Sequence, residues 1–257
     1  MFIKKNLLSN KARMKKIIVE HDINFFDFGC SKGQGTNWTK KAVKLNGIGF
    51  DLDQKKLNQA AKNGIICTDL NILDIPTEKY VQYVTIFHML EHLNSRSEAY
   101  AIIDKAIQVT KNSVIIKQPF YDADFLLFER GFKTFYSHWT GHRNQMVTTD
   151  FYYYLMEVRA QNKIVDFAIG YKKPITSSND EIIHSLSSKI DSLHYRAEQH
   201  PPKDNDVNFD FPLYYEIQVA IDVGGEGYGP IWEILAPTRV IMDTAESVKG
   251  HGVLRPV

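Results

Sequence analysis

Apolar and polar positions along this chain follow two periods, as expected where short buried strands are joined by amphipathic helices. Apolar runs bounded by glycine or polar residues predict strands, and apolar spacings of three and four predict helices. The predicted strands are 23–28, 46–51, 65–67, 81–87, 113–117, 163–171 and 214–221. The predicted helices are about 10–20, about 34–44, about 95–109 and one capped by Thr148 or Thr149 that runs to Val158. This alternation predicts an α/β fold with a doubly wound, mostly parallel sheet.

Two further segments stand out from the alternation. Residues 120–139 contain eight aromatic residues, and the steps of three and four from Phe125 to Phe135 predict one aromatic face of a helix. We expect an aromatic lid at about 120–147. Residues 175–210 are polar and predict an insertion before the last strand. We interpret 1–257 as a single domain, and the pattern after Gly224 predicts no element.

Composition narrows the possible partners. The formal net charge is +1, so no global charge favours nucleic acid or an anionic membrane. Six basic residues precede residue 20 and predict a solvated helix face, since no aromatic residues interleave with them for base stacking. They are Lys4, Lys5, Lys11, Arg13, Lys15 and Lys16. Two cysteines without C-x-x-C spacing, no apolar leader and no membrane span predict a cytoplasmic protein.

The first strand ends in a glycine-rich loop. The nine residues from Asp27 to Gly35 (DFGCSKGQG) contain three glycines, which let backbone approach a ligand without a Cβ atom. Their spacing differs from the dinucleotide G-x-G-x-x-G and from the phosphate loop G-x-x-x-x-G-K-[ST]. Asp51 ends the second strand, where a carboxylate can bind the ribose hydroxyls of an adenosine cofactor.

This loop resembles the first signature of class I S-adenosylmethionine-dependent methyltransferases, in which the loop passes under the methionine part of the cofactor. The resemblance covers about residues 10–222. It implies a seven-stranded Rossmann-like sheet whose last strand is antiparallel and lies between the fifth and sixth. It also implies S-adenosyl-L-methionine as the cofactor. The residues expected at the cofactor are Asp27, Gly29, Cys30, Ser31, Gly33, Gly35, Asp51, Leu52, Asp69, Leu70 and His88.

Asp69 and Leu70 follow the third strand, where this family places an acid or amide beside the adenine. Such a side chain accepts a hydrogen bond from the exocyclic amine, and an apolar neighbour packs on the ring. The alternative for Asp69 is a cap of the next turn. Cys30 has no activating base in the sequence, so we expect a small residue beneath the ligand rather than a nucleophile.

The segment from Phe87 to Leu93 (FHMLEHL) follows the fourth strand. Its His88-x-x-Glu91-His92 has the spacing of an inverted zinc-protease motif. That motif needs a long helix and a third ligand, whereas this one follows a buried strand. It resembles the h-x-L-E-H-L turn of one broad group of these methyltransferases, so we expect His88 at the cofactor and no metal. No Asn/Asp-Pro-Pro-Tyr/Phe tetrapeptide is present here, which disfavours methylation of DNA bases.

Candidate catalytic groups lie in residues 136–143 (YSHWTGHR), because the segments after strands four and five face the methyl group in this fold plan. His138 or His142 could act as general base for a hydroxyl acceptor. Arg143 could hold a carboxylate or phosphate. Both histidines could also be loop residues bonded to backbone, or part of a cofactor lid.

The sequence therefore predicts methyl transfer to an oxygen or nitrogen of a small polar metabolite, a sugar or an anionic compound among them. In-line displacement needs alignment and exclusion of water rather than covalent machinery. Two alternatives stay open. One is an S-adenosylmethionine-binding sensor or scaffold without catalysis, and the other is an RNA methyltransferase guided by the basic N-terminus. The oligomeric state is not predicted.

Overall fold

The computed structural model describes residues 1–3, 11–204 and 206–245. Its strands are β1 Phe2–Ile3, β2 Ile23–Phe28, β3 Asn46–Phe50, β4 Ile66–Thr68, β5 Val81–Phe87, β6 Thr110–Pro119, β7 Phe132–Thr134, β8 Asp166–Pro174, β9 Ile183–Ser185, β10 Tyr214–Asp222 and β11 Arg239–Asp243. Its α-helices are α2 Lys11–Glu20, α3 Gln34–Val43, α4 Gln54–Lys62, α5 Arg96–Val109, α6 Asp124–Glu129, α7 Thr148–Ala160 and α8 Gly229–Leu235. Short 3₁₀ turns are η1 Ile72–Asp74, η2 Leu90–His92 and η3 Tyr136–His138.

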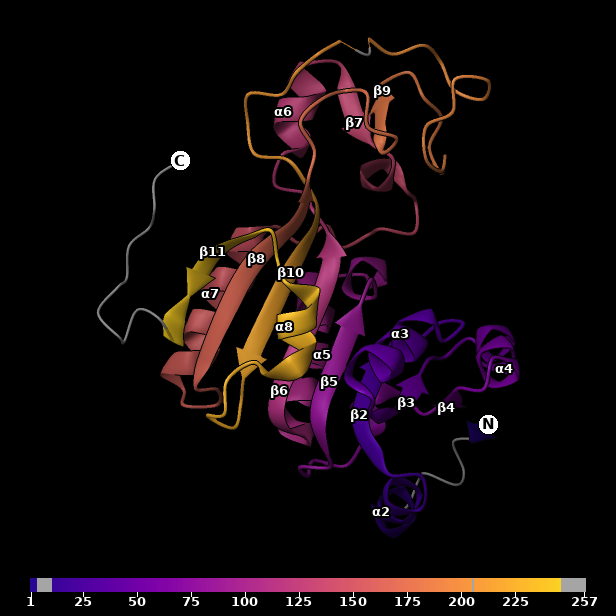
Figure 1. The fold of residues 1–257 in the computed structure, drawn as a ribbon, viewed down its shortest axis with the longest axis vertical. Helices are drawn as coiled ribbons and strands as arrows, with labels where there is room; N and C mark the ends of the chain where they lie inside the picture. The colour runs from indigo at the N-terminus through magenta and orange to yellow at the C-terminus, as the bar shows by residue number, and fades with distance from the viewer. Residues whose placement is uncertain (4–10, 205, 246–257) are drawn as a thin grey trace.

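Nine strands form the central sheet, in the order β1-β4-β3-β2-β5-β6-β10-β8-β11 (Figure 1). The strands from β4 to β6 pair in parallel, and β10 pairs antiparallel with both β6 and β8. This confirms the predicted doubly wound, mostly parallel sheet with an antiparallel strand between the fifth and sixth. The predicted number of seven strands is wrong. Among the described residues the sheet has nine strands, because β1 and β11 add one strand to each edge.

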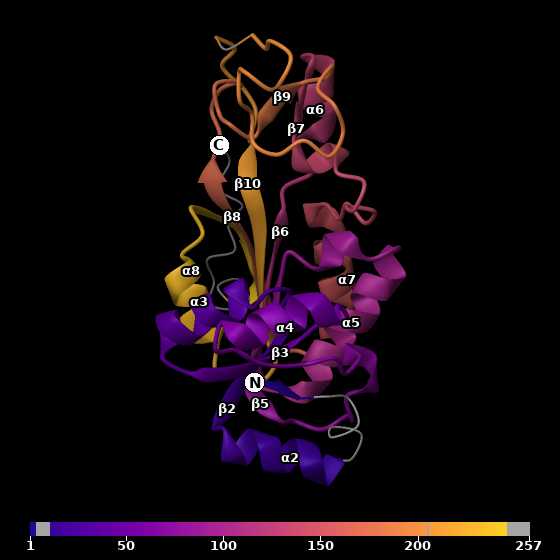
Figure 2. The same cartoon turned by 90° about the vertical axis from the view of Figure 1, so that its right-hand side faces the viewer.

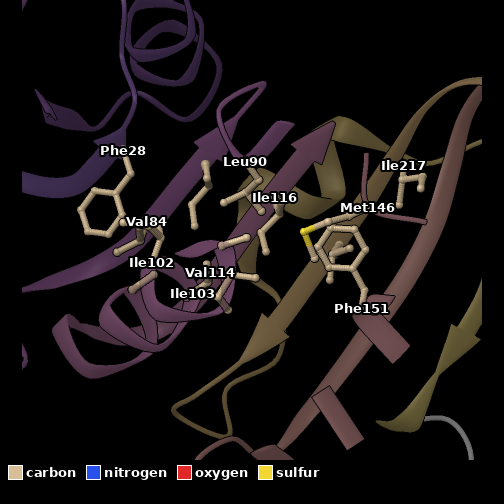
Figure 3. Close-up of a cluster of buried hydrophobic side chains, with 14 of the residues drawn as sticks. Phe28, Val84, Leu90, Ile102, Ile103, Val114, Ile116, Met146, Phe151 and Ile217 are labelled. Carbon is tan, nitrogen blue, oxygen red and sulfur yellow. The ribbon is translucent and has the colours of Figure 1, made fainter. Parts of the chain in front are cut away.

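Helices cover both faces of the sheet. Figure 2 shows α3 and α8 on one side and α5 and α7 on the other. Successive residues of β6 point to opposite faces, as a strand requires. Val114 and Ile116 belong to the large buried cluster with Ile102 of α5 (Figure 3), whereas Ile115 packs in a separate cluster with Ile231 of α8. β6 is an inner strand of the sheet and is buried on both faces. Its carboxyl end can therefore contribute to a site.

The segments predicted as aromatic lid and polar insertion fold together. β7 from the first segment pairs antiparallel with β9 from the second, with Lys133 opposite His184. Figures 1 and 2 show α6, β7 and β9 beyond the end of the sheet at which β6 ends and β10 begins. We call residues 120–147 and 175–213 the lid.

The aromatic face predicted for a single helix is wrong. α6 ends at Glu129, and Gly131 with φ of 78° turns the chain into β7. Phe125 and Phe128 are 70% and 60% exposed, whereas Phe132 is buried in β7. The spacing of three and four is therefore produced by one helical turn and one strand, whose pairing with β9 the local pattern does not reveal.

Other local predictions also need correction. α7 is capped by Val147, so Thr148 and Thr149 are helical residues rather than the cap. Asp122 accepts hydrogen bonds from the backbone and hydroxyl of Thr148, and Asp150 accepts one from the backbone of Val147. The sequence patterns also did not predict α4, α8 and β11.

Three basic residues near the N-terminus form ion pairs within the fold. Lys11 and Lys15 both pair with the carboxylate of Glu78, and Lys16 pairs with Glu20. Lys4 and Lys5, with the side chain of Arg13, lie outside the described residues. Across the described ranges, no helix has the length and apolar character that a membrane crossing needs.

Candidate functional site

The glycine loop between β2 and α3 is held against the end of β3. The backbone N–H groups of Gly29 and Cys30 both donate to the carbonyl of Phe50, at 2.8 and 2.9 Å. Gly29 has φ of 76°, and a Cβ atom there would lie 2.3 Å from Cγ of Met89. Only glycine fits this position, because both the backbone angle and the close approach of Met89 exclude a side chain. Gly33, also at positive φ, caps α3 and lines neither of the cavities described below.

Asp51 at the end of β3 ties this loop to the next one. Its Oδ2 accepts a hydrogen bond of 2.8 Å from the backbone of Ser31, and its Oδ1 accepts one of 2.9 Å from the backbone of Asp53. A carboxylate oxygen has two lone pairs, so each keeps capacity for a ligand hydroxyl. Asp51 is therefore held in place and still available for binding.

Asp51 lines a cavity of about 440 Å³, which we call the Asp51 cavity. The structure brings six predicted cofactor residues together on its wall: Gly29, Ser31, Asp51, Leu52, Leu70 and His88. Asn71, Ile72 and Met89 also line it and were not predicted. Asp69 is not among the lining residues, and its carboxylate accepts a hydrogen bond from Gln54 at 3.3 Å.

A second cavity of about 400 Å³ adjoins the first, and we call it the Lys117 cavity. The two cavities share Gly29, Ser31 and His88. Three more predicted residues line the second one: Asp27, Cys30 and Gly35. Its other walls are Gln34, Trp38, Phe87 and Lys117, which the sequence patterns did not single out.

Asp27 and Cys30 form the buried floor of the Lys117 cavity. Asp27 accepts hydrogen bonds from the hydroxyls of Thr36 and Thr85, at 2.5 and 2.9 Å. Burial raises the pKa of Asp27 to about 6, although these two bonds oppose the shift. Burial also raises the pKa of the Cys30 thiol. A neutral, buried thiol is a weak nucleophile, which agrees with the interpretation of Cys30 as a small residue beneath a ligand.

Three charged side chains meet at the carboxyl ends of β5 and β6. Nε2 of His88 lies 3.5 Å from Oε2 of Glu216, and Nζ of Lys117 lies 3.2 Å from the same oxygen. Burial lowers the pKa of His88, but hydrogen bonds to Glu216 and Glu91 outweigh it and raise the pKa to about 9. Burial raises the pKa of Glu216, yet His88 and Lys117 outweigh that effect and the pKa is lowered. Positively and negatively charged side chains therefore lie beside His88, which lines both cavities.

The sequence holds a weak signal for this group. Lys117 closes the predicted fifth strand, at the end where α/β sheets bind ligands. Glu216 is a charged residue inside an otherwise buried strand, and a buried charge is normally paired. The partner of each comes from a different strand, so neither could be identified from its own segment.

The predicted catalytic residues lie elsewhere. His138 is 3.5 Å from Nζ of Lys133 and lines a third cavity with Phe125 and Phe128. Arg143 donates a hydrogen bond to Asn94 at 3.0 Å. His142 packs its ring on His92, with centroids 4.9 Å apart. None of the three lines the Asp51 or Lys117 cavity.

Comparisons with known proteins agree with this geometry. Residues 26–113 match the protein family described as a methyltransferase domain. A crystal structure of an S-adenosylmethionine-dependent methyltransferase from Archaeoglobus fulgidus is similar at 15% identity, with 85% of this chain and 94% of that chain covered and a TM-score of 0.54. Magnesium protoporphyrin IX methyltransferase from Synechocystis PCC 6803 is similar at 13% identity, with 82% and 80% covered and a TM-score of 0.44. A search of curated proteins found no match.

The residues of the cleft fit S-adenosylmethionine. Asp51 offers a carboxylate for the ribose hydroxyls, and Leu70 and Ile72 offer apolar surface for the adenine ring. The glycine loop exposes backbone for the methionine end. The size of the Asp51 cavity lies within the range of about 300–1,000 Å³ that small-molecule sites occupy.

Proposed function

Because the chain belongs to the class I S-adenosylmethionine-dependent methyltransferases, we propose that it moves the methyl group of this cofactor to an oxygen or nitrogen of a small polar metabolite. S-Adenosylmethionine supplies a methyl group on a sulfonium, from which a neutral thioether can leave. The chain's own residues then need to align the acceptor with the methyl group and exclude water.

The observation that carries the proposal is that the two cavities share three lining residues, Gly29, Ser31 and His88. A ligand in the Asp51 cavity that reaches past the glycine loop would therefore present its end to the Lys117 cavity. We propose that Asp51 binds the ribose, that Leu52 and Leu70 contact the adenine, and that the glycine loop holds the methionine end. The acceptor then enters the Lys117 cavity. We assign Asp69 no role at the cofactor, because its carboxylate faces Gln54.

The walls of the Lys117 cavity favour a polar acceptor of small size. The Lys117 ammonium and the His88 imidazole offer hydrogen-bond donors, while Gln34 offers both a donor and an acceptor. Trp38 and Phe87 pack edge to face with centroids 6.1 Å apart, and Nζ of Lys117 lies 5.2 Å from the centre of the Phe87 ring. An aromatic wall beside polar groups suits the ring of a sugar or of an anionic aromatic compound.

An RNA acceptor is the less supported alternative. Helix α2, which carries the described basic residues, lies beyond the opposite end of β2 from the glycine loop (Figure 1). Lys11 and Lys15 share Glu78 as a partner, so part of their charge is compensated within the fold. An RNA guided by this helix would approach the sheet at the end away from the cleft.

Calorimetry with S-adenosylmethionine and its demethylated product tests the cofactor first. We expect saturable binding of both, and absence of binding would contradict the proposal. Incubation with labelled cofactor and a panel of sugars, amino acids and aromatic acids then tests transfer, with Asp51→Ala as the inactive control. Binding without transfer to any compound would favour the sensor alternative, and salt-sensitive RNA binding would favour the RNA alternative.

A further inference from the structure

Glu91, His92 and His142 gather beside the cofactor cleft. One potential ligand atom from each residue lies within 4.8 Å of those of the other two. Glu91 and His92 belong to η2, and His142 comes from the lid. His92 also lines the Asp51 cavity. The group therefore joins the turn after β5 to the lid at the edge of the cleft.

Hydrogen bonds to backbone define the tautomer of both histidines. Nδ1 of His92 lies 3.0 Å from the carbonyl of Gly141, and Nδ1 of His142 lies 2.9 Å from the carbonyl of Tyr136 and 3.2 Å from the hydroxyl of Tyr121, which can also accept. A carbonyl can only accept, so each Nδ1 carries the proton and each Nε2 keeps a free lone pair. Metal-bound imidazoles have this arrangement, in which the second ring nitrogen donates to a carbonyl that orients the ring.

Glu91 contributes a buried carboxylate with unused capacity. Its residue is 1% exposed, and its Oε2 has no hydrogen-bond partner within the part of the chain that the structure describes. Its other oxygen, Oε1, lies 3.5 Å from Nδ1 of His88. Burying a carboxylate oxygen without a partner is costly. A cation between Glu91 and the two histidines would remove that cost.

We propose that Glu91, His92 and His142 bind one divalent transition-metal ion, through Oε2 of the carboxylate and Nε2 of each imidazole. Two imidazoles and one carboxylate are a ligand set that suits Zn²⁺ and related ions and leaves coordination positions open. His88 supports the carboxylate from its far side, as outer residues of metal sites do.

The open positions face the cleft, because His92 is part of its wall. They would hold water at the edge of the Asp51 cavity, which the proposed function assigns to the cofactor. The site differs from the inverted zinc-protease motif considered for the sequence, in which His88 would be a ligand. The structure instead turns His88 toward Glu91 and Glu216 and brings in His142.

The test uses the full chain, stripped of metal with a chelator and titrated by calorimetry with ZnCl₂ and, separately, MnCl₂ in the absence of cofactor. We expect one equivalent of Zn²⁺ to bind, more tightly than Mn²⁺, as the Irving–Williams order requires. His92→Gln, His142→Gln and Glu91→Gln should each weaken Zn²⁺ binding at least about tenfold. His138→Gln, a lid histidine outside the group, should leave it unchanged.

Absence of stoichiometric Zn²⁺ binding, or binding that survives both His92→Gln and His142→Gln, would overturn the proposal. Circular dichroism checks the fold of each variant. If Glu91→Gln unfolds, Zn²⁺ binding by the two histidine variants tests the proposal. Titration of each protein with the demethylated cofactor separates the two proposals. A chain that binds Zn²⁺ but no cofactor keeps the metal site and loses the proposed function, and the reverse result removes only the metal site.

Discussion

The backbone N–H of Ser31 donates a hydrogen bond of 2.8 Å to Oδ2 of Asp51. This bond joins the glycine loop after β2 to the end of β3, so one carboxylate serves both as a structural anchor and as a wall of the Asp51 cavity. Changing Asp51 therefore affects the shape of the loop as well as the charge that faces a ligand. Asp53, two residues further on, provides a control that separates effects on ligand binding from effects on stability.

Asp51→Asn should weaken binding of the demethylated cofactor by about ten to a hundredfold, the range for loss of a hydrogen bond to a charged group. Asp53→Asn is the matched control, because Asp53 caps α4 through the N–H groups of Lys55 and Lys56 and does not line the cavity. Calorimetry measures both. Equal affinity of the Asp51→Asn variant and the original chain would show that this carboxylate does not bind the cofactor.

Gly29→Ala should destabilise the protein more than Gly131→Ala. Both glycines have positive φ, which costs about 1–2 kcal/mol for another residue. A Cβ atom at Gly131 meets nothing within 4 Å, whereas one at Gly29 meets Met89 at 2.3 Å. Overpacking should lower the free energy of unfolding of the Gly29→Ala variant by about 1–3 kcal/mol more. Urea unfolding measures the difference, and equal losses would contradict the close contact with Met89.

Lys117 and Glu216 should be energetically coupled. Glu216 is buried, so Lys117→Met leaves its carboxylate with His88 and Gln218 as partners. Each single change, Lys117→Met or Glu216→Gln, should lower the free energy of unfolding by about 1–3 kcal/mol, since the remaining charge loses one of its partners. The double variant should lose less than the sum, with a coupling of about 1–2 kcal/mol.

Lys111→Met serves as the control for this cycle. Lys111 lies on the same strand β6 but is exposed, so its change should alter stability by less than about 0.5 kcal/mol. Additive losses in the Lys117 and Glu216 variants would indicate that the two side chains do not interact in solution.

Asp124 in the lid should make stability depend on pH. Burial raises its pKa from 3.8 to about 7, although a hydrogen bond from Ser137 opposes the shift. Between these two values the folded state binds more protons than the unfolded state. The free energy of unfolding therefore falls as pH rises through this window, by at most about 1.4 kcal/mol per pH unit for this group.

Asp124→Asn removes this contribution. The variant should gain stability relative to the original chain from pH 4 to pH 7, and the difference should stay constant above that range. Asp210→Asn, which changes a carboxylate that is 79% exposed and paired with Arg130, should show no such trend. Unfolding in urea at several pH values measures each profile, and parallel profiles for all three proteins would contradict burial of the Asp124 carboxylate.

The sheet could be predicted from the sequence because its central strands are apolar runs that carry their own boundaries. β1 could not be predicted, since it has two residues and owes its existence to pairing of Phe2 with Cys67. β11 is an edge strand with mostly half-buried residues, so its apolar pattern is weak. The lid was misinterpreted because β7 depends on a partner strand from a distant segment.

Six of the residues predicted at the cofactor line the Asp51 cavity, for a similar reason. The glycine spacing and Asp51 lie within one strand-helix-strand unit, so their relationship is local. Lys117 and Glu216 come from other strands, and His142, a proposed metal ligand, comes from the lid. Their roles depend on the order of strands and on the pairing of β7 with β9, which no single segment encodes.

The last residue of β8, Pro174, lies opposite the first residue of β10, Tyr214. The whole segment 175–213 therefore leaves the sheet and returns to it at one paired position, as if it were the loop of a hairpin. The register of β8 on β10 is thus fixed outside this segment, whereas β7 depends on the segment for its partner strand β9. A replacement of the segment would have to keep a strand that pairs with β7.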